Sequence, residues 1–200
     1  MRRWNGWGDD GYDYPLPPSA EVYLEQLVGA GQRFEDVEKG KVLAGVPPSP
    51  LPEDTLVSTD ADQRLLHARG QSFPDWVEMR SGRIRSFPAG VAYPRSDQDV
   101  RTLIDYARRT GSALIPYGGG TSVVGHINPL EGRPSLTLDM SRMNRLVDLD
   151  ETSLLATFDP GGKARPRSDT SVFRVVLLLL ADVKLIVPKP YYMFLTAFGT

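Results

Sequence analysis

The sequence predicts an α+β fold in which a βαβ unit is followed by a β-meander and preceded by a helical N-terminal arm. The first observation is a helical pattern between two short strand-like segments, at residues 90–94 and 113–116. The second is a later series of strand-like segments that only turns separate. A helical crossover lets the two strands that it joins run parallel, with a right-handed connection.

The helix of the βαβ unit has clear ends in the sequence. Ser96 is a natural N-cap, and Asp97 and Asp99 place negative charge where the helix dipole favours it. Gly111 follows the last turn and can take the left-handed conformation of a helix end. Apolar residues recur at the spacing of one helical face at Val100, Leu103, Ile104 and Ala107. We therefore expect this face to pack against the sheet.

The composition of three further segments predicts the strands of the β-meander. Residues 136–139 have the composition of a strand. Residues 144–149 and 154–158 are expected to pair as a hairpin, with the turn at residues 150–152. Together they form the β-rich part that follows the βαβ unit.

The N-terminal arm is expected to contain a helix. Ser19 is its expected N-cap, and Gly29 ends the pattern. The positions expected to be buried on this helix are Val22, Tyr23, Leu27 and Val28. Residues 47–52 are rich in proline, which is not tolerated in a helix interior, so we expect a stiff linker there. A second short helix is expected at residues 63–68.

The composition excludes several classes of function. The chain has no cysteine, which removes disulfide scaffolds, cysteine-ligated metals and thiol catalysis. It has two histidines, and we predict no metal site. Its 23 basic and 25 acidic residues give a formal net charge of −2, so it lacks the basic surplus of a general nucleic-acid binder. Hydrophobic residues make up 40% of the chain, which is ordinary for a globular domain.

A glycine-rich loop follows the second strand of the βαβ unit. Its sequence is Tyr117-Gly-Gly-Gly-Thr-Ser122. Glycine can adopt positive φ and lets a ligand approach the backbone closely, and successive N–H groups in such a turn bind anions. The hydroxyl groups of Thr121 and Ser122 add donors. Because open α/β sheets bind ligands at the carboxyl ends of parallel strands, a pyrophosphate is the expected ligand.

Other phosphate loops fit this sequence less well. Residues 120–125 have Walker-A spacing, but His126 stands where that motif needs lysine and Ile127 where it needs serine or threonine. A Rossmann fingerprint needs its glycines after the first strand, at the start of a helix. From local composition alone, the three glycines are equally compatible with a tight turn that binds nothing.

The residues around the loop extend the pattern. The run from Ile115 to Val124 resembles the pyrophosphate loop of FAD-binding domains in the vanillyl-alcohol oxidase and p-cresol methylhydroxylase (PCMH) superfamily. Residues 93–96 and 136–145 are similar to the same domain at the right spacings. Within the superfamily, Trp4-Asn-Gly-Trp-Gly8 and Leu65-Leu-His-Ala-Arg-Gly70 are similar to signatures of alkyldihydroxyacetonephosphate synthases and their bacterial FAD-linked oxidase relatives.

The resemblance implies the first lobe of a PCMH-type FAD-binding domain, with flavin chemistry beneath a C-terminal substrate cap. It implies that the FAD pyrophosphate is held by Pro116, Tyr117, Gly118, Gly119, Gly120, Thr121 and Ser122. Some superfamily members attach their flavin to a histidine in this loop. Thr121 stands at the aligned position here, which implies non-covalent FAD. We expect His126 to be solvated and His67 to be a packing residue.

The resemblance predicts three parts of the chain. They are an N-terminal arm and helical segment at residues 1–85, a partial FAD-binding domain at residues 86–160, and a tail at residues 161–200 without family pattern. A basic loop after Pro160 replaces the expected second flavin-binding segment. We hypothesise that this tail is truncated or frame-shifted, giving a fragment. The substrate cap and the catalytic residues would then lie outside the chain, so we name no catalytic residue.

These observations leave three functions open. The first is the FAD-binding portion of an FAD-dependent oxidoreductase or alkylglycerone-phosphate-synthase-like enzyme. The second is a non-catalytic remnant that folds but binds no flavin, and the third is a phosphate-binding module unrelated to flavin. The longest apolar run is far below the ~20 residues that span a bilayer, and no signal peptide is visible, so we expect a cytoplasmic protein. The expected partners are FAD and an unknown small substrate, without nucleic acid.

Overall fold

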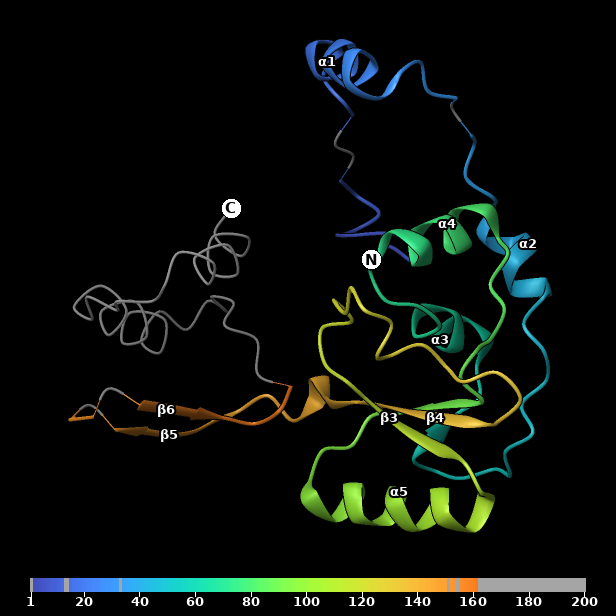
Figure 1. The fold of residues 1–200 in the computed structure, drawn as a ribbon. Coiled ribbons are helices and arrows are strands. Elements are labelled where there is room, and N and C mark those ends of the chain that lie inside the picture. Colours follow the sequence, from blue (N-terminus) through green and yellow to red (C-terminus); the bar gives the residue numbers. More distant parts are fainter. Residues whose placement is uncertain (1, 13–14, 33, 151, 154, 162–200) are drawn as a thin grey trace. The chain divides into compact units, whose positions relative to one another are not determined.

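The computed structural model describes residues 2–12, 15–32, 34–150, 152–153 and 155–161 (Figure 1). The predicted tail at residues 161–200 therefore lies outside the described residues, apart from Gly161. The chain divides into two compact units, residues 1–143 and residues 144–200, and each is described by itself. The part boundaries expected from the sequence, after residues 85 and 160, stay predictions.

A four-stranded sheet with the order β1-β2-β4-β3 is the centre of the first unit (Figure 1). Its strands are β1 (Val57–Ser58), β2 (Gly90–Ala92), β3 (Ala113–Tyr117) and β4 (Ser135–Asp139). β2 and β3 both run parallel to β4, and β1 pairs antiparallel with β2. This mixed architecture confirms the predicted fold class. The helix joins two parallel strands, as predicted, but β4 lies between them.

β4 lies inside the parallel sheet, which corrects the predicted meander. All five of its residues are buried, because β2 pairs on one side and β3 on the other. The hairpin predicted after it is confirmed in the second unit, where β5 (Leu146–Asp150) pairs antiparallel with β6 (Leu155–Phe158). The alternating polar side chains of β4 are typical of a half-exposed strand. Here Ser135, Thr137 and Asp139 are all buried, which local patterning does not reveal.

Helix α5 (Asp97–Thr110) covers one face of the sheet (Figure 1). Its predicted ends are confirmed, because the Ser96 side chain accepts a hydrogen bond from the Asp99 N–H at 3.2 Å and Gly111 has a φ of 66°. The main core cluster consists of Ala92, Leu103, Tyr106, Leu136 and Leu138. Burial of this apolar face against the sheet stabilises the unit.

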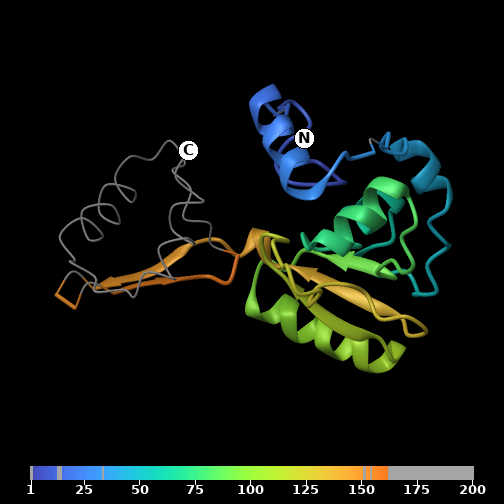
Figure 2. The ribbon, with the colours of Figure 1, turned by 45° about the horizontal axis from the view of Figure 1, so that its top comes forward.

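Helices α2 (Lys39–Ala44), α3 (Ala61–Leu66) and α4 (Phe73–Ser81) lie on the other side of the sheet from α5 (Figures 1 and 2). α3 starts and ends two residues before the predicted short helix. α4 was not predicted, although its start carries a capping box in which Ser72 and Asp75 bond each other's backbone N–H. The spacing of those two residues was the available signal.

Helix α1 (Pro18–Val28) is the predicted helix of the arm, and Gly29 ends it as expected. Its N-cap is Pro17 and not Ser19, and no side chain caps it. The four positions predicted to be buried are all exposed, from 55% at Val22 to 82% at Val28. The predicted burial on α1 is therefore wrong, because helical spacing of apolar residues does not supply a surface to pack against.

Candidate functional site

The glycine loop leaves the sheet at the carboxyl end of β3, as predicted. Residues 118–134 connect β3 to β4. The seven predicted residues differ in exposure, with Pro116, Gly118, Gly119 and Thr121 exposed, Ser122 half-buried, and Tyr117 and Gly120 buried. We call Gly118, Gly119 and Thr121 the tip of the loop, and Tyr117 and Gly120 its base.

The two glycines of the tip have no packing reason to be glycine. A Cβ atom at Gly118 would have nothing within 4 Å, and one at Gly119 would meet only the Thr121 side chain, at 3.6 Å. Of the three consecutive glycines, Gly120 alone takes a positive φ, of 74°. The fold itself would accept a side chain at Gly118 or Gly119. Close approach of a ligand to the backbone is a physical reason for glycine at such positions.

Successive backbone N–H groups of the loop are unpaired. Those of Gly119, Gly120, Thr121 and Ser122 donate to no acceptor within the part of the chain that the structure describes, and the first three lie at or next to the left-handed Gly120. Gly120 is buried, where an unsatisfied donor costs about 1–3 kcal/mol. Consecutive amides beside a left-handed residue form the backbone arrangement that binds phosphate and other anions. The loop can therefore offer an anion three donors at no cost in lost protein hydrogen bonds.

A buried polar cluster holds the base of the loop. The Tyr117 side chain is 1% exposed, and its hydroxyl donates to the Leu66 carbonyl oxygen at 3.4 Å and accepts a hydrogen bond from the Arg2 guanidinium. Its ring lies against the His67 imidazole, with 4.5 Å between ring centroids. The Tyr117 side chain thus faces the protein interior. Only the backbone of Tyr117 is therefore available to a ligand at the loop.

His67 links the cluster to the central strand. It is 2% exposed, which confirms a packing role, but both ring nitrogens also form hydrogen bonds. Nδ1 lies 2.6 Å from the Gln63 carbonyl oxygen, and Nε2 lies 2.9 Å from Oδ2 of Asp139. Because a carbonyl and a carboxylate can only accept, the doubly protonated imidazolium satisfies both bonds. His67 and Asp139 then form a buried ion pair next to Tyr117.

Two pKa shifts describe the electrostatics of this cluster. Burial by itself would raise the pKa of the Asp139 carboxyl, but hydrogen bonds from His67 and Ser141 outweigh it and hold that pKa below the ordinary 3.8. Burial, reinforced by the Asp139 carboxylate, raises the pKa of Tyr93 to about 12. Tyr93 packs edge-on against His67 and stays neutral at physiological pH. Asp139 and Arg2 therefore bring charge to the cluster, and Tyr93 adds none.

A second set of contacts holds the far side of the loop. The Gln71 N–H donates to the Ser122 carbonyl oxygen at 2.7 Å. The Asn128 side chain accepts from the Gly70 N–H at 3.0 Å and donates to Asp75 at 2.7 Å. A Cβ atom at Gly70 would collide with the Ser122 carbonyl, so this glycine lets the two segments approach. The connection between α3 and α4 thus supports the loop.

Sequence reasoning missed most of the residues that support the loop. These are Arg2, Gly70, Gln71, Asn128 and Asp139. Their contacts, such as Arg2 with Tyr117, Gln71 with Ser122 and Asn128 with Gly70, join segments far apart in the chain, so no local pattern reveals them. His126, which was expected to be solvated, is exposed, and its N–H donates to the Ser122 hydroxyl oxygen at 3.2 Å.

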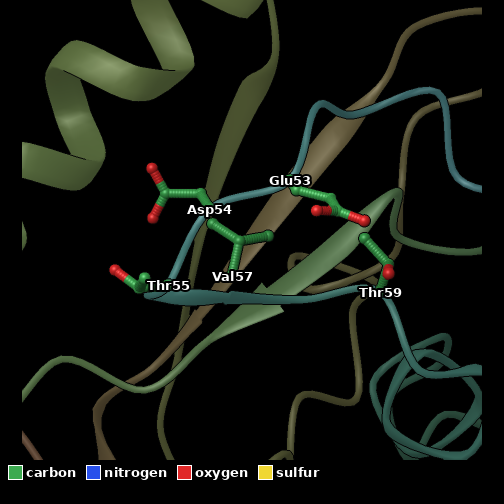
Figure 3. Close-up of a pocket in the computed structure, with 5 residues that line it drawn as sticks. All are labelled: Glu53, Asp54, Thr55, Val57 and Thr59. Carbon is green, nitrogen blue, oxygen red and sulfur yellow. The ribbon is translucent and has the colours of Figure 1, made fainter.

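Two surface hollows are lined by residues outside the glycine loop. One of about 470 Å³ is lined by Glu53, Asp54, Thr55, Val57 and Thr59 (Figure 3). The other, of about 830 Å³, is lined by Thr55, Leu56, Val57, Ser58, Gln63, Tyr93, Arg95, Asp99 and Arg142. The two carboxylates of the first would repel a phosphate. In the second, the Arg95 backbone N–H donates to the Asp99 carboxylate at 2.7 Å, and the Arg142 guanidinium lies over the Tyr93 ring. The unpaired amides make the glycine loop the stronger candidate.

Comparison with known proteins identifies the family of this part of the chain. Residues 88–165, which include β2, β3, β4 and the glycine loop, match the family model of the FAD binding domain. An alkyldihydroxyacetonephosphate synthase of Dictyostelium discoideum is 30% identical over 196 residues, which cover 80% of this chain and 32% of that protein. A mitochondrial cytochrome D-lactate dehydrogenase of Arabidopsis thaliana is 32% identical over 110 residues, 54% of this chain and 18% of the relative.

A solved structure shows the same fold. An alkyldihydroxyacetonephosphate synthase in crystal form P1 superimposes with a TM-score of 0.66 at 21% identity, over 86% of this chain and 38% of the other. The chain thus spans about a third of the length of the first relatives that it matches. Residues 88–165 are accordingly an FAD-binding domain, and the chain is a homologue of alkyldihydroxyacetonephosphate synthases and FAD-linked oxidases.

Proposed function

We propose that the glycine loop holds the pyrophosphate of FAD. The predicted residues Pro116, Tyr117, Gly118, Gly119, Gly120, Thr121 and Ser122 form this site. The observation that carries the proposal is the set of unpaired N–H groups at Gly119, Gly120 and Thr121. They lie beside two glycines that the fold does not require. Oxygen acceptors of a phosphate supply the hydrogen bonds that the protein leaves open.

Each part of the loop has its own task in this proposal. The amides of residues 119–121 donate to phosphate oxygens, and the exposed Thr121 hydroxyl adds a donor. Gly118 and Gly119 leave room for the ligand at the backbone. The base and the α3–α4 connection keep the amides in place before the ligand arrives, which lowers the entropic cost of binding. The chemistry that bound FAD supplies is electron transfer at its ring system, while the protein supplies orientation.

We propose that the FAD is held without a covalent bond. The loop position at which some superfamily members attach flavin carries Thr121, whose hydroxyl is a poor nucleophile at neutral pH. The chain has no cysteine, and His126 lies outside the seven proposed residues. Precipitating the loaded protein with acid should release the flavin into the supernatant. Flavin that stays with the denatured protein would show that a covalent link exists.

For the enzyme as a whole we propose an FAD-dependent reaction of the synthase or oxidase class. The identity to the Dictyostelium discoideum synthase over 80% of this chain supports the first, and similarity to D-lactate dehydrogenases and a glycolate oxidase subunit supports the second. Assays on purified protein should compare formation of alkyldihydroxyacetone phosphate with oxidation of D-lactate and of glycolate. A flavin-free protein without either activity would favour the non-catalytic remnant.

A cytoplasmic location belongs to the same proposal. In the described part of the chain, no helix has the length and apolar character needed to cross a bilayer. The near-balanced charge argues against a nucleic-acid partner, because such binding depends on a basic surplus. Cell fractionation tests the location, and recovery in a membrane or organelle fraction would contradict it.

The loop assignment is tested with Gly119→Val. A branched side chain at the tip blocks the amides, while the open space around Gly119 lets the fold remain intact. We expect the dissociation constant for FAD to rise tenfold or more, a change of about 1.4 kcal/mol, in a flavin-fluorescence titration. The thermal unfolding midpoint should stay close to that of the unmodified protein.

Gly31→Val is the matched control for this substitution. A Cβ atom there also has nothing within 4 Å, its φ is not positive, and it lies in the N-terminal arm. We expect FAD affinity to be unchanged in this variant. Equal affinities for Gly119→Val and Gly31→Val would refute the loop assignment. Equally tight binding of a nucleotide without flavin would favour a general phosphate-binding module.

A further inference from the structure

The N-terminal arm reaches the glycine loop through Arg2. The arm turns back on itself, with a bridge between Arg2 and Asp9 and a hydrogen bond from the Arg3 N–H to the Gly8 carbonyl oxygen at 3.0 Å. Gly8 permits this turn with a φ of 86°. The signature-like segment at residues 4–8 therefore forms the turn that connects Arg2 and Arg3 to Gly8 and Asp9. The fold brings Arg2 to a loop more than a hundred positions away in the sequence.

The Arg2 guanidinium lies directly at the base of the loop. Its Nη2 donates to the Tyr117 hydroxyl oxygen, and its Cζ lies 5.2 Å from the centroid of the Tyr117 ring. A Cβ atom built at Gly120 would fall 2.5 Å from Nη2. The guanidinium thus occupies the space that Gly120 leaves by lacking a side chain, next to one of the unpaired amides.

Arg2 brings a charge to the loop that the loop itself lacks. Residues 116–126 contain neither lysine nor arginine. In the described residues, no carboxylate lies within 4.0 Å of the Arg2 guanidinium. Its partner Tyr117 does not neutralise it, because burial raises the pKa of Tyr117 and the opposing effect of Arg2 does not cancel that rise. One contact to Tyr117 leaves other guanidinium N–H donors available.

We infer that Arg2 is an anion-binding residue of the glycine loop and supplies the positive charge for a phosphate-bearing ligand. The inference rests on the proposed function, because it assigns a further residue to the same site. Guanidinium groups suit phosphate through charge-assisted, often bidentate hydrogen bonds. Tyr117 orients the guanidinium by a hydrogen bond and by a cation–π contact. The N-terminal arm is in this way part of the binding site.

The test compares Arg2→Gln, Arg2→Lys and Arg3→Gln in the full chain by titration with FAD at low and high salt. Arg3→Gln is the matched control, since Arg3 donates to the Tyr12 carbonyl oxygen within the arm, at 2.7 Å. We expect Arg2→Gln to raise the dissociation constant about tenfold or more at low salt, as for loss of a charged hydrogen bond. Its salt dependence should become flatter than that of the unmodified protein. Arg2→Lys should restore part of the affinity, because it keeps the charge.

The outcomes separate this inference from the proposed function. If the unmodified protein binds FAD and Arg2→Gln binds it as well as Arg3→Gln does, Arg2 is not a binding residue and the loop assignment stands. If Arg2→Gln and Arg2→Lys lose affinity equally at every salt concentration, Arg2 acts only by packing, and the inference is overturned. If the unmodified protein binds no FAD, the proposed function fails and this inference fails with it. Thermal unfolding of each variant identifies loss of structure.

Discussion

The base and the tip of the glycine loop are neighbours in sequence and differ in what holds them. At the base, Tyr117 is buried against His67, and Gly120 is enclosed by the Tyr117 hydroxyl and the Arg2 guanidinium. At the tip, Gly118 and Gly119 have open space around them. The base is thus specified by the fold, and the tip is free to be specified by a ligand. Substitutions at the base should change stability first, and substitutions at the tip should change binding alone.

The largest effect on stability is expected for His67→Ala. The substitution leaves the buried Asp139 carboxylate without its imidazolium partner and removes the surface under the Tyr117 ring. Breaking one side of a buried ion pair costs about 3–5 kcal/mol. Urea denaturation followed by circular dichroism measures this loss. A loss below about 1 kcal/mol would show that the base of the loop does not depend on the pair.

Gly120→Ala is expected to have the next largest effect among substitutions at the base of the loop. The added Cβ atom would overlap the Tyr117 hydroxyl, and the positive φ of this residue disfavours any side chain. Strain and overpacking together should cost about 2–3 kcal/mol in unfolding free energy. Gly118→Ala is the matched control at the tip and should change that free energy by less than about 0.5 kcal/mol. Equal losses in the two variants would remove the distinction between base and tip.

Acid should weaken the base through Asp139. The pKa of this carboxyl is lower in the folded chain than its ordinary 3.8, so the unfolded state binds a proton more readily as the pH falls. The contribution of Asp139 is therefore complete well above pH 3.8 and is lost as the pH drops through the folded-state pKa. Each unit of pKa difference corresponds to about 1.4 kcal/mol.

Asp139→Asn provides the comparison for this pH dependence. It removes the titrating group, so the unfolding free energy should fall less steeply between neutral pH and pH 3 than it does for the unmodified chain. Urea denaturation at a series of pH values measures both slopes. Parallel curves for the two proteins would mean that the acid sensitivity arises elsewhere.

The smallest change in unfolding free energy is expected for a substitution on α1, whose apolar side chains are exposed like the tip of the loop. Leu27 is 61% exposed, so Leu27→Ser should change the unfolding free energy by less than about 0.5 kcal/mol. Leu103→Ala, on the buried face of α5, should cost about 2–5 kcal/mol because it leaves a cavity in the core. A large loss for Leu27→Ser would show that α1 packs against another surface.

The contrast between α1 and α5 shows where local reasoning succeeds. Both helices were predicted near their observed bounds, and both end at a glycine as expected. α5 has a strong N-cap at Ser96 and lies on the sheet, whereas α1 starts after Pro17 without a side-chain cap and buries none of its residues. Spacing of apolar residues determined that each segment is helical. Whether a partner surface exists for the apolar face depends on the rest of the chain.

By itself, the sequence determined the fold class, the βαβ unit with its capped helix, and the position of the glycine loop after β3. These features depend on local spacing, capping residues and glycine, which act over a few positions. Only the tertiary structure decided that β4 lies between β2 and β3 and that residues remote in sequence support the loop. Contacts such as Arg2 with Tyr117 join distant segments, and no local pattern encodes them. The tertiary structure therefore shows that this glycine-rich turn is a loop with a supported base and unpaired amides.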